Sequence, residues 1–141
     1  AMVILAVDLG KARTGVAICD KGEMLASPIG TITDRSLERV ADKIAEYAVQ
    51  RKAEKLVVGL PKNMDGTEGE SAQNARAFAQ LLSEKCGLPV DMQDERGTTI
   101  TAHSFLNATD TRGKKRKQAV DTLSATIILE DYQHKRKNQR I

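Results

Sequence analysis

A chain of 141 residues, 40% of them apolar and 29% charged, has the size of one compact domain and can bury one hydrophobic core. No stretch approaches the roughly 18 consecutive apolar residues of a membrane-spanning helix, which argues against a membrane partner. The net charge is only +3, yet residues 110–141 hold nine basic and four acidic side chains, a local +5 that favours a polyanion-binding surface.

The start of the chain and its cysteines bear on location. No basic-then-apolar leader precedes the first apolar segment. The two cysteines, Cys19 and Cys86, lie outside any CxxC pattern and indicate neither a disulfide framework nor a zinc site. We therefore expect a cytoplasmic protein with reduced thiols.

The first third of the chain predicts a three-stranded antiparallel meander followed by a helix. Apolar segments at 3–7, 15–20 and 23–27 are separated by short polar turns, and Pro28 ends the third. An amphipathic helix over 37–48 comes next, with Asp34 or Ser36 as its cap.

From residue 55 onward, strands and helices alternate. Strands are expected at 55–60 and 90–94, with a helix between them that Gly87 and Pro89 end. Two further helices are expected, one capped by Thr98 and one over about 115–134. The sequence thus predicts one α/β domain over 1–141, with a mixed five-stranded sheet of three antiparallel and two parallel strands and helices on both faces.

Acidic residues follow the first and last predicted strands. Asp8 ends the first strand and the Asp94-Glu95 pair ends the last, at the sheet edge where α/β proteins bind ligands. Asp121, early in the final helix, could join them. Such a cluster repels itself unless a cation is bound, and oxygen ligands suit Mg²⁺ or Mn²⁺, two of which can hydrolyse a phosphodiester. The alternative is that these acids only end strands and favour a helix N-terminus.

Glycine-containing loops carry the candidate phosphate contacts. Around Gly10, the backbone could lie close to a phosphate whose oxygens Arg13 holds. Arg96 follows the last strand. The remaining candidates are Lys11, Lys62, Asn63, Lys114, Lys115, Arg116 and Lys117. Ordinary turns and solvated surface are the alternative. The same strand-Asp-x-Gly hairpin also opens sugar-kinase, actin and chaperone ATPases, but those enclose nucleotide between two such domains and this chain has the length of one.

The sequence resembles the YqgF/RuvX proteins of bacteria in four motifs spread in order over the chain: DLGKARTGVA at 8–17, VGLPKNMDGTEG at 58–69, DERGTT at 94–99 and KQAVDTLSA at 117–125. That family is named for Holliday junction resolution or pre-16S rRNA processing and has an RNase H-like fold. The resemblance implies that Asp8, Glu95, preferred over Asp94, and Asp121 form a metal-binding catalytic triad. One departure is Gly97, where the family usually has a bulky apolar residue.

We therefore expect a metal-dependent nuclease that acts on structured DNA or precursor rRNA. Asp8 would bridge two Mg²⁺ or Mn²⁺ ions, with Glu95 and Asp121 completing their coordination. The interpretation is compatible with a homodimer. The alternative is a non-catalytic nucleic-acid-binding accessory factor in ribosome assembly or transcription, which would take up no Mn²⁺ through these carboxylates.

Overall fold

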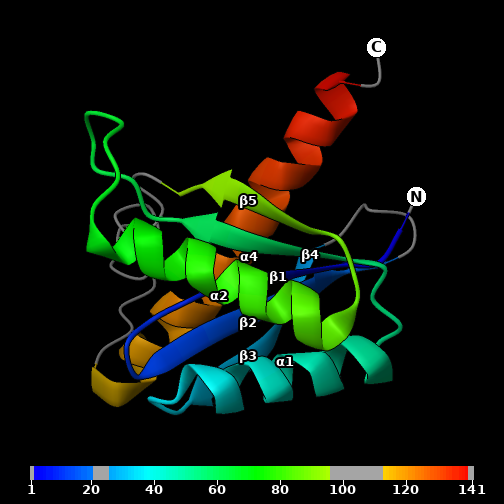
Figure 1. The fold of residues 1–141 in the computed structure, drawn as a ribbon, viewed down its shortest axis with the longest axis horizontal. Helices are drawn as coiled ribbons and strands as arrows, with labels where there is room; N and C mark the ends of the chain where they lie inside the picture. Colours follow the sequence, from blue (N-terminus) through cyan, green and yellow to red (C-terminus); the bar gives the residue numbers. More distant parts are fainter. Residues whose placement is uncertain (1, 21–25, 96–112, 140–141) are drawn as a thin grey trace.

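A five-stranded mixed sheet lies at the centre of the fold in this computed structural model, which describes residues 2–20, 26–95 and 113–139 and, within the last helix, only the side chains of 123–136. The strand order is β3-β2-β1-β4-β5 (Figure 1). The strands are β1 (Ile4–Asp8), β2 (Arg13–Cys19), β3 (Ala26–Thr33), β4 (Lys55–Leu60) and β5 (Val90–Asp94). The first three pair antiparallel, whereas β4 pairs parallel with both β1 and β5. The predicted fold class is confirmed.

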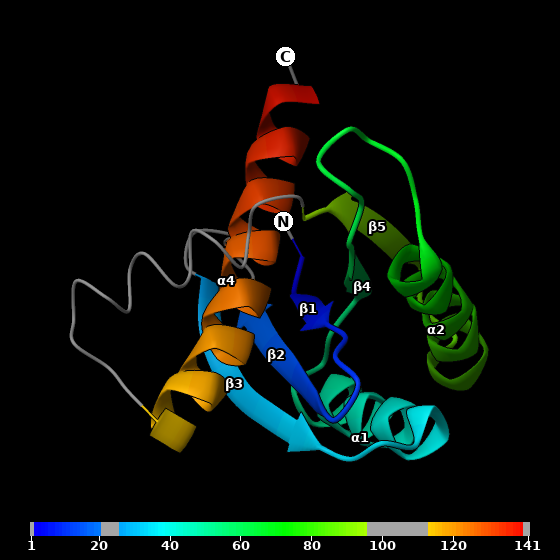
Figure 2. The same cartoon turned by 90° about the vertical axis from the view of Figure 1, so that its left-hand side faces the viewer.

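Helices cover both faces of this sheet. Figure 2 shows α1 (Leu37–Gln50) and α2 (Glu70–Cys86) on one face and α4 (Gly113–Gln139) across the other. Because successive strand side chains point to opposite faces, the sheet contributes to two cores. The core under α1 and α2 contains Leu5, Val7, Leu56 and Val58. The core under α4 contains Ile4, Ala6, Val57, Ala125, Ile128 and Leu129.

The third strand differs from its prediction. The apolar segment at 23–27 suggests a strand that stops before Pro28, but β3 begins at Ala26 and continues to Thr33. Proline is tolerated here because β3 is an edge strand and its pairing with β2 shifts between Val16 and Ala17. Pro28 therefore sits at an irregularity of the ladder, where a missing N–H removes no regular bond.

The helix bounds agree with the sequence in part. The last helix is longer than predicted at both ends, since α4 spans Gly113–Gln139 rather than 115–134. The helix predicted from Thr98 lies outside the described residues. None of the helices within the described ranges combines the length and apolar character needed to cross a bilayer.

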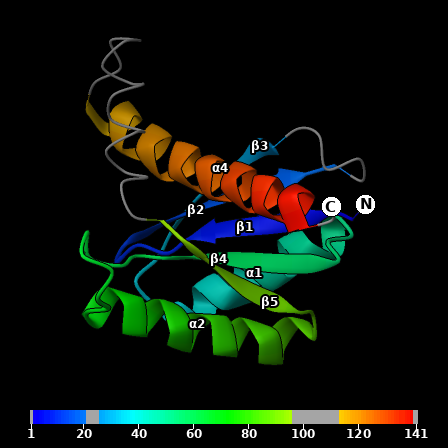
Figure 3. The same cartoon turned by 90° about the horizontal axis from the view of Figure 1, so that it is seen from above.

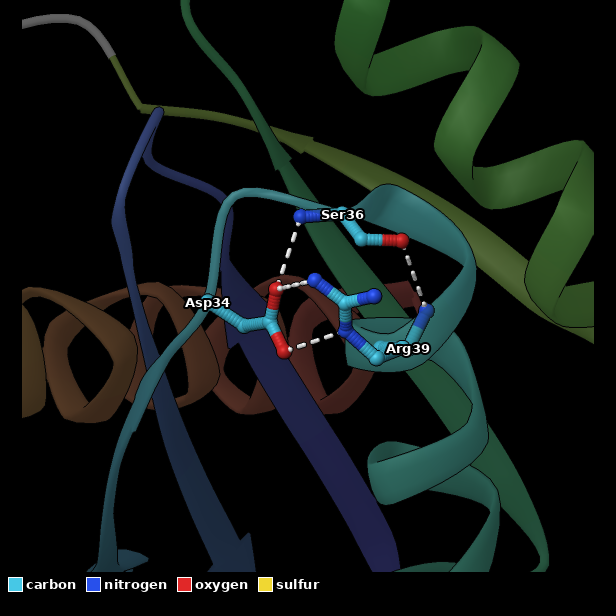
Figure 4. A network of polar contacts seen from close by, with 3 residues as sticks. All are labelled: Asp34, Ser36 and Arg39. Atoms are coloured by element: carbon cyan, nitrogen blue, oxygen red, sulfur yellow. Dashed lines mark hydrogen bonds and ion pairs between the residues drawn. The ribbon is translucent and has the colours of Figure 1, made fainter.

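Both candidate caps of α1 take part in its N-terminus (Figure 4). The Ser36 hydroxyl accepts a hydrogen bond from the Arg39 backbone N–H at 3.3 Å. The Asp34 carboxylate accepts from the Ser36 N–H at 2.9 Å and from the Arg39 guanidinium at 2.8 and 3.0 Å. The hydrogen bond from Arg39 lowers the pKa of Asp34 to about 2. The cap thereby fixes the path of the chain from β3 into α1.

Candidate active site at the carboxyl edge of the sheet

The parallel strands bring two of the predicted acids to one edge of the sheet. Asp8 ends β1, Glu95 directly follows β5, and β4 lies between these strands. Figure 3 shows the carboxyl end of β1 and the loop after β4 on the same side of the molecule as the N-terminal half of α4. The register pairs Val7 with Val58 and Gly59 with Gln93, so Asp8, Gly59 and Glu95 all face α4.

The carboxyl group of Glu95 lies within hydrogen-bonding reach of the Asp8 carboxyl group. Burial, reinforced by the negative charge and closeness of the Asp8 carboxyl group and by the charge of Asp94, raises the pKa of Glu95 to about 9. Two ionised carboxyl groups this close repel one another, which favours a proton on one of them. The pair is therefore protonated once near neutral pH when no cation is bound.

Strand alternation separates the two members of the Asp94-Glu95 pair. Asp94 follows Met92 on the side of the sheet that α2 covers, and Met92 packs against that core. Glu95 follows Asp91 and Gln93 on the opposite side. Of these two acids, Glu95 is the one whose pKa is raised by its interaction with Asp8.

Gly59 lies directly beneath the Glu95 carboxyl group. A Cβ atom at position 59 would lie 2.8 Å from Cδ of Glu95, closer still to its Oε2, and 2.6 Å from Cδ1 of Ile128. Sequence reasoning placed Gly59 in a motif but gave it no role. The available signal was a glycine inside a strand of mostly apolar, buried residues, which often marks a close approach to the backbone.

The third predicted acid, Asp121, belongs to α4, and its side chain is outside the described part of the structure. Its position lies one helical turn before Ala125 and two turns before Ile128. Both of those residues are buried against the sheet face that carries Asp8 and Glu95. Within the described side chains, which leave Asp121 out, no three acids, histidines or cysteines form a cluster that could hold a metal ion.

The chemistry of this edge fits a hard divalent cation. Asp8 and Glu95 offer carboxylate oxygens, the donors that Mg²⁺ and Mn²⁺ prefer. Two further side-chain oxygens on the described part of the α4 side are buried without a hydrogen-bond partner, Oε1 of Gln93 and Oγ of Ser124. A bound cation would relieve the mutual repulsion of the Asp8 and Glu95 carboxyl groups that raises the pKa of Glu95.

The hairpin between β1 and β2 carries three of the predicted phosphate contacts. A Cβ atom on Gly10 would collide with the carbonyl oxygen of Arg13, so the tight turn itself requires glycine. Lys11 is exposed, and Arg13 is half-buried on the same sheet face as Asp8. The Asp34 N–H donates to the Ala12 carbonyl at 3.0 Å and fastens this hairpin to the start of α1.

The loop after β4 is held by its own side chains. The Asn63 amide, a predicted phosphate contact, donates to Oγ1 of Thr67 at 2.9 Å, and Thr67 donates to Asp65 at 2.7 Å. The Arg76 guanidinium of α2 donates two hydrogen bonds to the Glu68 carboxylate, at 2.7 and 2.8 Å. Asn63 therefore shapes the loop, which leaves Lys62 as its half-exposed cation beside the sheet edge.

Comparison with known proteins gives the family. A family profile described as RuvX, Holliday junction resolvase, matches residues 2–135. The chain belongs to the RuvX family. A relative from Listeria innocua, named as a candidate pre-16S rRNA nuclease, is 40% identical over 133 residues, covering 93% of this chain and 96% of its own. A relative of the same name from Heliobacterium modesticaldum is 39% identical and covers 93% and 88%.

Solved structures share the fold of this RuvX-family chain. RuvC of T. thermophilus in complex with a Holliday junction substrate superposes with a TM-score of 0.60 at 12% identity, covering 98% of this chain and 97% of that one. The fowlpox virus Holliday junction resolvase gives 0.58 at 15% identity and covers 95% and 99%. These matches show the predicted RNase H-like fold.

Several predicted contacts of this RuvX-family protein stay untested by the geometry. Arg96 lies outside the described residues. The side chains of the basic segment at the start of α4 are not described either; they are those of Lys114, Lys115, Arg116 and Lys117. Their phosphate-binding role remains a prediction.

Proposed function

We propose that this protein is a metal-dependent nuclease that hydrolyses phosphodiester bonds in structured nucleic acid. The observation that carries the proposal is the Asp8–Glu95 carboxyl pair, which meets across Gly59 at the carboxyl edge of an RNase H-like sheet. Precursor 16S rRNA and four-way DNA junctions are the substrates to test, because the names of its relatives and the family description point to them. The proposal takes residues 1–141 as one nuclease domain working in the cytoplasm.

Asp8, Glu95 and Asp121 are the residues proposed to hold Mg²⁺ or Mn²⁺. Bound divalent ions supply activation of a water and stabilisation of the leaving oxygen of a phosphodiester. Asp8 and Glu95 must give up their shared proton to become ligands, and their mutual repulsion then favours cation binding. The wall formed by Ile128 and the buried strand β4 limits water at Glu95 from one side.

Basic side chains around this edge are proposed to bind the nucleic-acid backbone. Lys11 lies on the hairpin after β1, Arg13 begins β2, and Lys62 lies on the loop after β4. The basic run at 114–117 precedes position 121 on α4 by one to two turns. Contacts of this kind release counterions, so we expect binding to weaken steeply as salt rises.

A cleavage panel tests the proposal. Wild type, Asp8→Asn and Glu95→Gln are assayed with Mg²⁺ or Mn²⁺ on single strands, duplexes, four-way DNA and precursor 16S rRNA. We expect wild type to cut at least one structured substrate, and both variants to lose cleavage at least 100-fold while retaining substrate affinity. Asp94→Asn is the matched control, because this neighbouring carboxylate lies on the other sheet face.

Two results would count against the nuclease. Cleavage that persists in purified Asp8→Asn protein would remove this residue from the chemistry. Tight binding by wild type without cleavage, combined with no Mn²⁺ uptake, would identify a non-catalytic nucleic-acid-binding protein instead.

A further inference from the structure

β1, which carries Asp8, and β5, which leads into Glu95, are not neighbouring strands, so the two side chains have to span the strand between them. β4 lies between β1 and β5, and adjacent strands are about 4.8 Å apart, so the backbones of β1 and β5 are separated by about 10 Å. The Glu95 carboxyl group nevertheless lies over Gly59 of β4 and comes close enough to Asp8 for that residue to raise its pKa. The Glu95 side chain must therefore cross the surface of β4 to reach Asp8.

The surface that Glu95 crosses is the backbone of Gly59. Continuing the register Val7–Val58 by one residue places Gly59 level with Asp8. A Cβ atom there would overlap the Glu95 carboxyl group on one side and the Ile128 methyl group on the other. Gly59 is not among the glycines with positive φ, so its backbone does not demand glycine. Glycine is needed at position 59 because the Glu95 carboxyl group and the Ile128 methyl group occupy the space that a side chain would fill.

A side chain at position 59 would be accommodated by movement of Glu95. β4 is paired on both sides, and its neighbours Val58 and Leu60 are buried, so this strand has no room to retreat. Ile128 is fully buried in the core under α4. The backbone of Glu95 is held by a hydrogen bond from its N–H to the Leu60 carbonyl at 3.1 Å. The flexible side chain of Glu95 is therefore the part that yields.

We infer that Gly59 is a positioning residue that seats the Glu95 carboxylate against Asp8, and that any side chain at position 59 displaces this carboxylate from the metal-binding position. The inference rests on the proposed function for its consequence in metal binding. Its structural core, the contact between Asp8 and Glu95, exists without a metal and can be measured without one.

The first test measures the coupling of Asp8 and Glu95 in metal-free protein. A double-mutant cycle of Asp8→Asn and Glu95→Gln on urea-induced unfolding gives their interaction in the wild-type background and again in the Gly59→Ala background. We expect a clear coupling in the first background and its loss in the second. Equal coupling in both backgrounds would overturn the inference.

The second test measures Mn²⁺ affinity by paramagnetic resonance titration of the same proteins. Supporting groups around metal ligands typically change affinity by 10–100-fold, so we expect Gly59→Ala to weaken Mn²⁺ binding by at least about 10-fold. Gly69→Ala is the matched control in the same segment, because its Cβ would meet nothing closer than the Asn63 amide nitrogen at 4.0 Å. Affinity should stay within about twofold of wild type in the control.

A variant of Ile128 separates displacement of Glu95 from a core-packing defect. Ile128→Val removes the Cδ1 atom that a side chain at position 59 would strike, so Gly59→Ala/Ile128→Val should fold at least as well as Gly59→Ala. We expect this double variant to recover unfolding stability but not Mn²⁺ affinity. Recovery of wild-type affinity would assign the defect to Ile128 and overturn the inference.

The outcomes for the inference and for the proposed function are distinguishable. Wild type that fails to bind Mn²⁺ would contradict the proposed function, and the coupling measurement would still decide the role of Gly59. Wild type that binds Mn²⁺ through Asp8 and Glu95, alongside a Gly59→Ala variant with unchanged affinity and coupling, would leave the function standing and remove the role of Gly59.

Discussion

At the scale of single residues, the site places a carboxyl group where it is difficult to ionise. Glu95 is half-buried, lies close to Asp8 and has Asp94 as its sequence neighbour, and each of these raises its pKa. Two carboxylates in contact are unfavourable without a cation, and favourable when one neutralises them. A bound cation would therefore favour ionised Glu95, whereas the metal-free protein is more stable when Glu95 is protonated.

The raised pKa of Glu95 predicts how stability changes with pH. Because the folded-state pKa lies above the unfolded value, the group stabilises the fold at low pH, and this contribution is lost as pH rises from about 5 toward 9. We expect wild type, freed of metal, to lose melting temperature relative to Glu95→Gln over this range. Calorimetry of both proteins between pH 5 and 9 measures the difference.

Glu84→Gln is the control for the pH series, because it makes the same substitution at an exposed position. A gap between wild type and Glu95→Gln that stays constant from pH 5 to 9 would show that Glu95 is not protonated in the folded protein.

The sequence predicts some residues of this site and misses another for a physical reason. Asp8 and Glu95 are recognisable because Asp8 ends β1 and Glu95 directly follows β5, and these two strands run in the same direction. Gly59 is not recognisable, because its importance depends on β4 lying between those strands and on the Glu95 side chain leaning back across it. Neither fact is visible from spacing along the chain.

At the scale of elements, α4 is tied to the sheet by a polar cluster beyond Ile128. The Tyr132 hydroxyl donates to the Asp91 carboxylate near the start of β5. Nζ of Lys55, the first residue of β4, lies 2.8 Å from the same carboxylate and 5.5 Å from the centre of the Tyr132 ring. The hydrogen bond to Asp91 raises the pKa of Lys55. The cluster holds α4 against the sheet at Tyr132, one helical turn after Ile128.

We expect Tyr132→Phe to lower the free energy of unfolding by about 1 kcal/mol, because it removes one hydrogen bond to a charged acceptor while keeping the buried ring. Urea unfolding followed by circular dichroism measures the change. Tyr47→Phe on α1 is the control, with an expected change of less than about 0.5 kcal/mol for a half-buried ring outside this cluster. An unchanged midpoint for Tyr132→Phe would mean that the cluster does not hold α4.

Element bounds could be predicted where the chain carries clear stop signals. The strands at 55–60 and 90–94 agree with the structure, since Pro61 and Pro89 bound the apolar segments. The third strand could not be placed, because Pro28 reads as a stop unless the strand is known to lie at an edge. The last helix extends past its apolar stripe into charged residues, where periodicity gives no signal.

At the scale of the whole molecule, chain order and strand character were enough to predict a mixed sheet of three antiparallel and two parallel strands, but not its strand order. Three antiparallel strands followed by alternating helices and strands leave few arrangements with right-handed, uncrossed connections. The observed order, with β1 and β4 at the centre, is one of them. The same topology carries Asp8, the loop after β4 and Glu95 to one edge, while α4 brings position 121 along the matching face.

Basic and acidic side chains are also distributed unevenly along the chain. The +5 of residues 110–141 is confined to the end of the chain, whereas the carboxyl pair lies among the first 95 residues. The fold returns α4 across the sheet that holds the acids. The proposed phosphodiesterase activity requires a polyanion-binding surface beside a cation-binding centre.

The most direct measurement is the position of Mn²⁺ in crystals of the wild-type protein, located by its anomalous scattering. We expect at least one ion within about 2 Å of carboxylate oxygens of both Asp8 and Glu95, with an oxygen of Asp121 in the same cluster. Manganese bound elsewhere, or an Asp8–Glu95 pair that holds no ion at saturating Mn²⁺, would contradict this expectation.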